Sequence, residues 1–204
     1  MRNTEKSFYG QQDGERILYV IRSHKIALIQ NLIKVYFAAL AVLTVFALIG
    51  YQTMGKTNPF TLAGFLLAAV IAFVGSLIAK ISDKRSINYI TDRRIIRFEP
   101  TTIFATNTRS LTWDEVVKVK TYPPNFLLKQ LAIGNIVIHA RTTVRPIGED
   151  KPDTVTVDDI EMKYVYFYRD LGNYLDKILF TYKRKPKEID LIKPFVAKLK
   201  GQRD

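Results

Sequence analysis

Two uncharged apolar runs lie almost back to back in this chain, and they constrain its fold more than any other feature. They occupy residues 35–51 and 59–79, and only QTMGKTN (52–58) separates them. Neither run contains Asp, Glu, Lys, Arg or His. A helix that crosses a bilayer needs about 20 mostly apolar residues. We therefore predict a hairpin of two antiparallel transmembrane helices over 35–80. The alternative is a hairpin buried in a soluble core, although two adjacent charge-free runs of this length are rare in soluble proteins.

The basic residues near the two runs are unequally distributed between the two sides of the predicted hairpin. The connection contains only Lys56, whereas basic residues flank both outer ends: Arg16, Arg22, Lys25 and Lys34 before the first run, and Lys80, Lys84, Arg85, Arg93 and Arg94 after the second. Cytoplasmic segments of membrane proteins carry an excess of Lys and Arg. We therefore expect a multi-pass protein of the plasma membrane, with both termini in the cytoplasm.

The charge and cysteine content limit the classes of partner and site. Lys and Arg number 31 against 19 Asp and Glu, a net charge of +12. Beside two membrane spans, we interpret this excess as attraction to an anionic lipid surface rather than to nucleic acid. The chain has no cysteine, which excludes a disulfide framework, thiolate metal sites and a cysteine nucleophile.

The remaining chain divides into three parts around the hairpin. Residues 1–34 read as a polar tail followed, from Glu15, by an amphipathic approach helix at the membrane surface. The alternative for this helix is a surface segment packed on the soluble part. Residues 83–185 form a separate domain. Residues 186–204 form a basic C-terminal tail that either touches the membrane or frays.

Short strands and then one helix are predicted for residues 83–185. Alternating or β-branched runs, separated by turn formers, predict strands at 87–91, 94–98, 103–113, 115–122, 134–142 and 154–160. A short helical turn is expected over 125–131. After the last strand, the spacing of apolar residues changes to three and four positions, which predicts a helix over 161–184. The apolar stripe of this helix contains Val165, Tyr168, Leu171, Leu175, Ile178 and Leu179. Closely spaced strands favour a small antiparallel sheet or barrel.

Small residues recur at four-residue intervals in the second run, at Gly64, Ala68, Ala72 and Ser76. Such a ladder allows another helix to approach closely. We favour the first span of the same chain as its partner over a seam between copies.

Five segments around and after the apolar runs occur in a recognisable order: GERILYVIRSHKIAL (14–28), NYITDRRIIRF (88–98), LTWDEVVKV (111–119), LAIGNIVIHA (131–140) and VTVDDIEMKYVYFY (155–168). Together they resemble the bacterial pleckstrin-homology (PH) membrane-protein family over about residues 14–182. The resemblance implies a mainly-β, α+β domain: a small, strongly bent antiparallel barrel closed at one end by a C-terminal helix. It names no ligand.

The residues indicate no catalytic or metal site, and we expect a non-enzymatic protein without a cofactor. His24 and His139 are each read as structural or solvent-facing, because no ligand set surrounds them in the sequence. The neighbouring Asp158 and Asp159 point to opposite faces of a strand end, so they cannot act as an acid/base pair. We expect them instead to help cap the following helix. Trp113 is expected in the core.

Anion recognition is the remaining chemistry. Guanidinium groups bind phosphate bidentately, and the candidate residues lie in or near the first strands of the domain: Arg93, Arg94, Arg97, Arg109, Lys118 and Lys120. The alternative is that these charges serve only membrane orientation and solubility. We expect a membrane-anchored PH-like module that binds anionic lipid headgroups or protein and peptide partners. The alternative function is a structural subunit of a membrane complex, self-associating through the spans or the domain.

Overall fold

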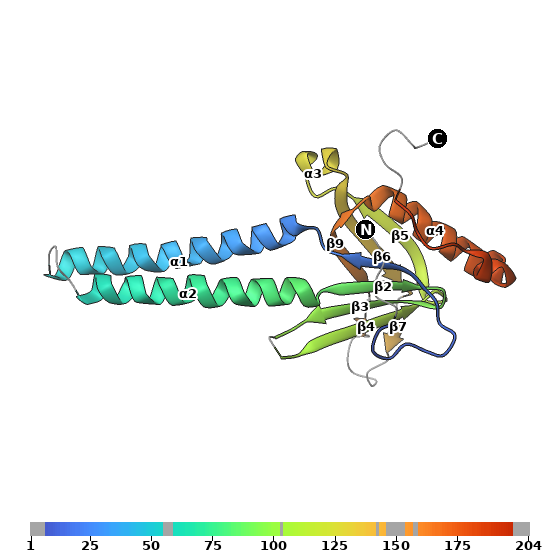
Figure 1. Ribbon diagram of the computed structural model, residues 1–204, viewed down its shortest axis with the longest axis horizontal. Helices are drawn as coiled ribbons and strands as arrows, with labels where there is room; N and C mark the ends of the chain where they lie inside the picture. The colour runs from blue at the N-terminus through green and yellow to red at the C-terminus, as the bar shows by residue number, and fades with distance from the viewer. Residues whose placement is uncertain are drawn as a thin grey trace. The chain divides into compact units, whose positions relative to one another are not determined.

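The computed structural model describes residues 7–54, 59–102, 104–141, 143–145, 154–156 and 159–197. It separates the chain into two compact units, shown in Figure 1. One unit contains residues 25–85 and the turn at 100–105. The other contains the remaining strands and the C-terminal helix. We describe each unit by itself.

The first unit is a helical hairpin formed by α1 (Lys25–Met54) and α2 (Pro59–Arg85). Both helices are long and apolar enough to cross a membrane. In their most apolar windows only 6% and 17% of the residues are buried. The core helices of a soluble protein would be mostly buried, because contiguous exposed apolar surface is costly in water. The exposed fractions therefore favour membrane spans over a soluble-core hairpin.

The two helices approach most closely at small residues of α2. A Cβ atom added to Gly64 would lie 2.3 Å from Cβ of Phe46, and one added to Gly75 would lie 2.6 Å from Cγ1 of Val35. Gly64 and Ala68 are buried, and Ala72 and Ser76 are half-buried. The small-residue ladder of α2 therefore lies against α1 of the same chain.

The second unit contains two antiparallel sheets. The four-stranded sheet has the order β1-β2-β3-β4, formed by β1 (Ile17–Arg22), β2 (Ile87–Thr91), β3 (Arg94–Pro100) and β4 (Thr106–Thr112). The three-stranded sheet has the order β5-β6-β9, formed by β5 (Val116–Tyr122), β6 (Ile133–Ala140) and β9 (Ile160–Tyr166). The remaining elements are α3 (Phe126–Gln130), a β7–β8 pair (Thr143–Arg145 and Thr154–Thr156), α4 (Tyr168–Arg184) and a 3-10 turn η1 (Pro186–Leu191).

Over the described residues the two sheets do not close into a barrel, which corrects the expected barrel architecture. The composition of β4 gives a physical reason. Thr106–Ser110 are polar and exposed, and Leu111 is the one buried residue of the strand. β4 therefore offers too little apolar surface to curl onto the second sheet.

The core lies where both sheets meet α4. It includes Ile90 and Ile95 from the first sheet, Ile136 from the second, and Leu171 and Leu175 from α4. Figure 1 shows α4, in orange-red, beside the β5–β6 sheet. Trp113 is fully buried, as predicted, and all members of the predicted stripe are buried: Val165, Tyr168, Leu171, Leu175, Ile178 and Leu179.

The expected approach helix over 15–34 is wrong for its first half. Residues Ile17–Arg22 form strand β1, which pairs antiparallel with β2, and the helix starts only at Lys25. The spacing of the buried residues in this strand imitates that of a helix, because Leu18 and Ile21 are three positions apart. A register shift between Ile17 and Tyr19 adds a residue to the strand and breaks its alternation.

The predicted helix over 161–184 also starts later than expected, at Tyr168. Residues 160–166 form β9 instead. Between two consecutive paired positions, the three residues from Gly134 to Ile136 of β6 face the four residues from Met162 to Val165 of β9. This bulge places the buried Met162 and Val165 three positions apart, which imitates helical spacing.

The described part of the segment after α4 packs on the domain, so of the two expected alternatives fraying is wrong for these residues, and contact with the membrane stays a prediction. Ile192 is buried, and the ring of Phe195 contacts those of Tyr19 and Tyr174. The backbone N–H of Phe195 donates to the carbonyl of Leu18 in β1, at 3.2 Å. Residues 198–204 of the predicted basic tail lie outside the described residues.

Candidate functional site

Arg94, a predicted anion-binding residue, is held by a buried carboxylate. Its Nε and Nη2 atoms donate to Oε1 and Oε2 of Glu15, each at 3.0 Å, and Nη2 also donates to the carbonyl of Gly10. The Glu15 side chain is fully buried and the Arg94 side chain is 18% exposed. The bidentate geometry leaves Arg94 neutralised inside the domain.

Glu15 accepts two further hydrogen bonds, from the hydroxyl of Thr91 at 2.8 Å and from the backbone N–H of Gln12 at 2.9 Å. Burial alone would raise the pKa of this carboxyl group. The hydrogen bonds from Arg94, Gln12 and Thr91, with the Arg94 charge, outweigh burial and hold the pKa of Glu15 below its ordinary value. Glu15 is therefore an ionised, fully engaged carboxylate.

A second pair lies beside the first. The backbone N–H of Arg16 donates to Oδ1 of Asp92 at 3.0 Å, and its Nε donates to Oδ2 at 3.3 Å. The guanidinium of Arg16 also donates to the carbonyls of Ile189 and Asp190. We call Glu15, Arg16, Asp92 and Arg94 the clasp, because they join the segment before the hairpin to the turn after it.

Trp113 extends the clasp towards β4 and β5. Its indole Nε1 donates to the carbonyl of Thr91 at 3.0 Å, and its backbone N–H donates to the carbonyl of Arg93 at 3.3 Å. The turn at residues 91–94 is thus tied to two other parts of the domain. The segment NYITDRRIIRF (88–98) therefore contributes mainly to the internal structure of the domain.

Arg97 is also engaged within the domain. Its guanidinium donates to the backbone carbonyl of Glu161 in β9 and, at 2.8 Å, to Oε1 of Glu99. Arg97 therefore links β3 to the second sheet. Neither Arg94 nor Arg97 is available as an unpaired cation for a ligand.

The other four predicted anion-binding residues are exposed. Arg93 donates to the side-chain amide oxygen of Gln12 at 3.2 Å, and Arg109 lies on the outer strand β4. Lys118 and Lys120 alternate along β5, so their side chains leave the same face of the sheet. Across the described residues, neither lysine has a carboxylate within ion-pair distance. The structure thus separates the six candidates into internal links and exposed cations.

The two histidines have structural contacts. Nδ1 of His139 lies 2.8 Å from Oδ2 of Asp159, and Oδ1 of Asp159 accepts from the N–H of Ala140. This contradicts the expected helix cap, because Asp159 serves β6 and the residue before α4 is Phe167. Asp158 lies outside the described residues. The ring of His24 stacks on that of Tyr166. In the part of the chain that the structure describes, no three acidic or histidine side chains gather as metal ligands.

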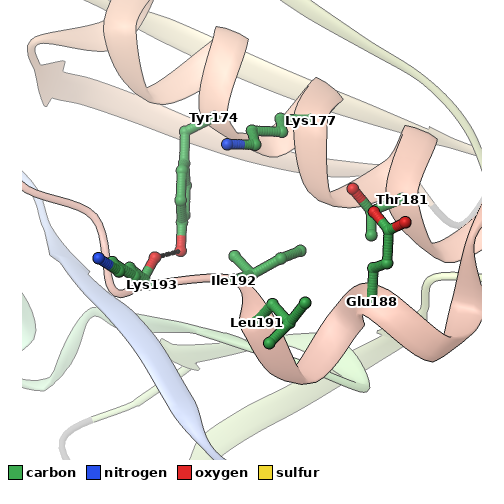
Figure 2. A pocket seen from close by; sticks show the side chains of 7 residues that line it. All are labelled: Tyr174, Lys177, Thr181, Glu188, Leu191, Ile192 and Lys193. Carbon is green, nitrogen blue, oxygen red and sulfur yellow. Dashed lines mark hydrogen bonds between the residues drawn. The ribbon is translucent and has the colours of Figure 1, made fainter.

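A hollow of about 330 Å³ lies between α4 and the segment after it. Figure 2 shows its lining residues: Tyr174, Lys177, Thr181, Glu188, Leu191, Ile192 and Lys193. The hydroxyl of Tyr174 donates to the carbonyl of Lys193 at 2.8 Å. Burial raises the pKa of Tyr174 to about 12, so the hydroxyl stays protonated at neutral pH. This hydrogen bond attaches the C-terminal segment to α4, so the residues around the hollow serve to pack two parts of the domain together.

Comparisons with known protein families, curated proteins and solved structures find no match to this chain.

The clasp residues Glu15 and Arg16 were missed by the sequence analysis as partners of Asp92 and Arg94. Antiparallel strands on either side of a hairpin bring together positions equally far from its two ends. Glu15 and Arg94 lie almost equally far from the observed ends at Lys25 and Arg85, but not from the ends of the hairpin predicted over 35–80. The pairing therefore becomes predictable only once the helices are known to extend beyond the uncharged runs.

Proposed function

We propose that this chain is a non-enzymatic, membrane-anchored module whose PH-like domain binds anionic phospholipid headgroups at the cytoplasmic face of the plasma membrane. The observation that carries the proposal is the pair of exposed lysines on β5. Lys118 and Lys120 project from one face without a carboxylate partner among the described residues, whereas Arg94 and Arg97 are neutralised internally.

The connections between the two units support a location close to the lipid. β1 ends at Arg22 and α1 begins at Lys25, while α2 ends at Arg85 and β2 begins at Ile87. Because both connections are this short, the strands β1 and β2 of the domain lie within a few residues, along the chain, of the helices that we propose to cross the membrane. Basic residues held near an anionic leaflet contribute about 1 kcal/mol each.

The order of elements supports the PH-like interpretation. The four strands of the first sheet, the three strands of the second and a C-terminal helix follow in this order, with the helical hairpin inserted between β1 and β2, α3 between β5 and β6, and the β7–β8 pair between β6 and β9. The domain therefore begins at β1, before the hairpin, and not at residue 83. The alternative function, a self-associating structural subunit, receives less support, because the small-residue ladder of α2 already packs on α1.

The insertion predicts that the domain folds without its membrane hairpin. β1 and β2 are antiparallel, and Arg22 pairs with Ile87. Replacing residues 23–86 by Asn-Gly, a dipeptide that suits a two-residue hairpin turn, is expected to give a folded, monomeric protein in buffer without detergent. Size-exclusion chromatography and a cooperative unfolding transition by circular dichroism would show this. Aggregation or absence of a transition would contradict it.

This hairpin-free protein provides the test of lipid binding. Replacing Lys118 and Lys120 by Gln is expected to weaken binding to vesicles rich in phosphatidylserine roughly 30-fold, from about 1 kcal/mol for each charge. Co-sedimentation with vesicles of increasing anionic content measures the change. The matched control removes two exposed charges, one at the last residue of α4 and one in the η1 turn that follows it, Arg184→Gln and Lys187→Gln.

Two results would contradict the proposed function. One is equal binding of the unmodified hairpin-free protein to neutral and anionic vesicles. The other is an equal loss of binding in the control variant, because the effect would then reflect net charge rather than the β5 face.

A further inference from the structure

The short helix α3 exposes adjacent large apolar side chains. Phe126 and Leu127 are 68% and 69% exposed, and Leu131, just after the helix, is 53% exposed. The helix is nevertheless firmly built. Leu128 is buried, and its N–H bonds to Oδ1 of the capping Asn125 at 2.9 Å. A well-ordered turn that exposes two neighbouring apolar side chains to water indicates a surface that contacts another molecule or a membrane in the functional protein.

A continuous set of contacts places α3 at the end of the domain where the chain enters the membrane helix. The N–H of Phe167 donates to the carbonyl of Ala132, two residues after α3. The ring of Phe167 packs on that of Tyr166 at 4.1 Å, and Tyr166 stacks on His24. His24, whose N–H donates to the carbonyl of Tyr164 at 2.8 Å, immediately precedes α1.

Cations lie beside the apolar turn. Lys129 of α3 and Arg169 of α4 line one small recess, which Ala132, Phe167 and Tyr168 complete. Nε of Arg169 donates to the hydroxyl of Tyr168 at 3.0 Å, which orients the guanidinium. The segment 123–134 contains no acidic residue. Exposed aromatic and aliphatic side chains next to Lys and Arg are typical of protein surfaces that lie in the headgroup region of an anionic membrane.

We propose that α3 inserts Phe126 and Leu127 into the leaflet that α1 enters, with Lys129 and Arg169 at the level of the lipid phosphates. This inference rests on the proposed membrane role of the domain and identifies its point of entry into lipid. The bilayer is the molecule that we expect to cover the exposed side chains of α3. The contacts through Tyr166 and His24 connect α3 to the start of a membrane helix, and the basic residues beside α3 complement anionic lipid.

The absence of cysteine in the sequence makes a direct test possible. The full chain carrying Leu127→Cys is labelled with an environment-sensitive fluorophore and reconstituted into vesicles of phosphatidylcholine and phosphatidylserine. We expect blue-shifted emission and a loss of fluorescence when the vesicles contain lipids with nitroxide groups on their acyl chains. The matched control is Lys187→Cys. Helix α4 starts beside Phe167 and runs for 17 residues, so its far end lies about 25 Å away, and no loss is expected there.

Equal quenching at positions 127 and 187, or no quenching at position 127, would overturn the insertion. Efficient disulfide cross-linking of Leu127→Cys between copies would overturn it as well, in favour of a second copy as the occupant. Circular dichroism of both labelled variants establishes that they are folded.

The Lys118→Gln and Lys120→Gln changes separate this inference from the proposed headgroup binding. Quenching at position 127 that persists while these changes leave vesicle binding of the hairpin-free protein unaltered would retain the insertion and reject headgroup recognition by β5. Loss of headgroup binding without any quenching at position 127 would do the reverse.

Discussion

Replacing Glu15 by Ala is expected to destabilise the domain by about 3 kcal/mol or more, because removal of one partner of a buried ion pair leaves the other charge uncompensated. Here the guanidinium of Arg94 would lose both of its carboxylate hydrogen bonds, and the hydroxyl of Thr91 would lose an acceptor. Urea unfolding of the hairpin-free protein, followed by the fluorescence of Trp113, measures the change. Trp113 is the single tryptophan in the sequence.

The matched control is Glu188→Ala. Glu188 pairs with Lys185 at 3.0 Å, but both side chains are at least half exposed, and exposed pairs contribute about 1 kcal/mol or less. The Glu15 prediction would fail if both variants lost the same small amount. Combining Glu15→Ala with Arg94→Ala should recover part of the loss, since the double variant no longer buries an unpaired charge.

The pH dependence of stability gives a second readout on Glu15. Its pKa in the folded state lies below the ordinary value of 4.5. The stability that this shift contributes is fully present above about pH 4.5 and is lost as the pH falls through the lower folded-state pKa. Glu15→Gln should flatten this acidic part of the stability profile.

Where the sequence predicted the structure well, a single strong signal was present. The charge-free runs predicted α1 and α2, and turn formers around INYIT predicted β2 at Ile87–Thr91 with its observed bounds. The stripe from Tyr168 to Leu179 predicted the buried face of α4. Each of these features depends on local periodicity, which the sequence carries directly.

The two misassigned helical segments share one physical cause. In β1 and in β9 a bulge adds a residue to the strand, so that buried residues fall three apart instead of two. At β9 Tyr164 adopts a positive φ of 54°, and its N–H bonds to the side chain of Asn135. Local spacing cannot reveal such a bulge, because the partner strand creates it.

The candidate site was predictable only in part for a related reason. The sequence identifies Arg93, Arg94 and Arg97 as a cluster of cations, but whether each is exposed depends on residues far away. Arg94 is neutralised by Glu15, 79 residues earlier, and Arg97 reaches the carbonyl of Glu161, 64 residues later. Lys118 and Lys120 have no such partner in the described chain, and strand alternation alone predicts their common face.

Replacing Trp113 by Ala is expected to destabilise the domain by about 3–5 kcal/mol, the usual cost of removing a buried tryptophan. Trp113 is fully buried in the core shared by both sheets, and its indole N–H satisfies the carbonyl of Thr91. Since small domains are stable by about 5–15 kcal/mol in total, the variant should be near its unfolding threshold. Circular dichroism of the hairpin-free variant measures the loss of stability.

Trp113→Phe separates packing from hydrogen bonding. It keeps an aromatic ring in the core but leaves the carbonyl of Thr91 without its donor, which costs about 1–3 kcal/mol. In the full chain, the hairpin should remain inserted in both variants, because a membrane helix satisfies its own backbone hydrogen bonds. In vesicles that contain the full chain, protease added to the side that carries the domain should therefore digest the domain of Trp113→Ala and leave a protected hairpin. A domain as resistant as that of the unmodified protein would show that Trp113 is not central to its stability.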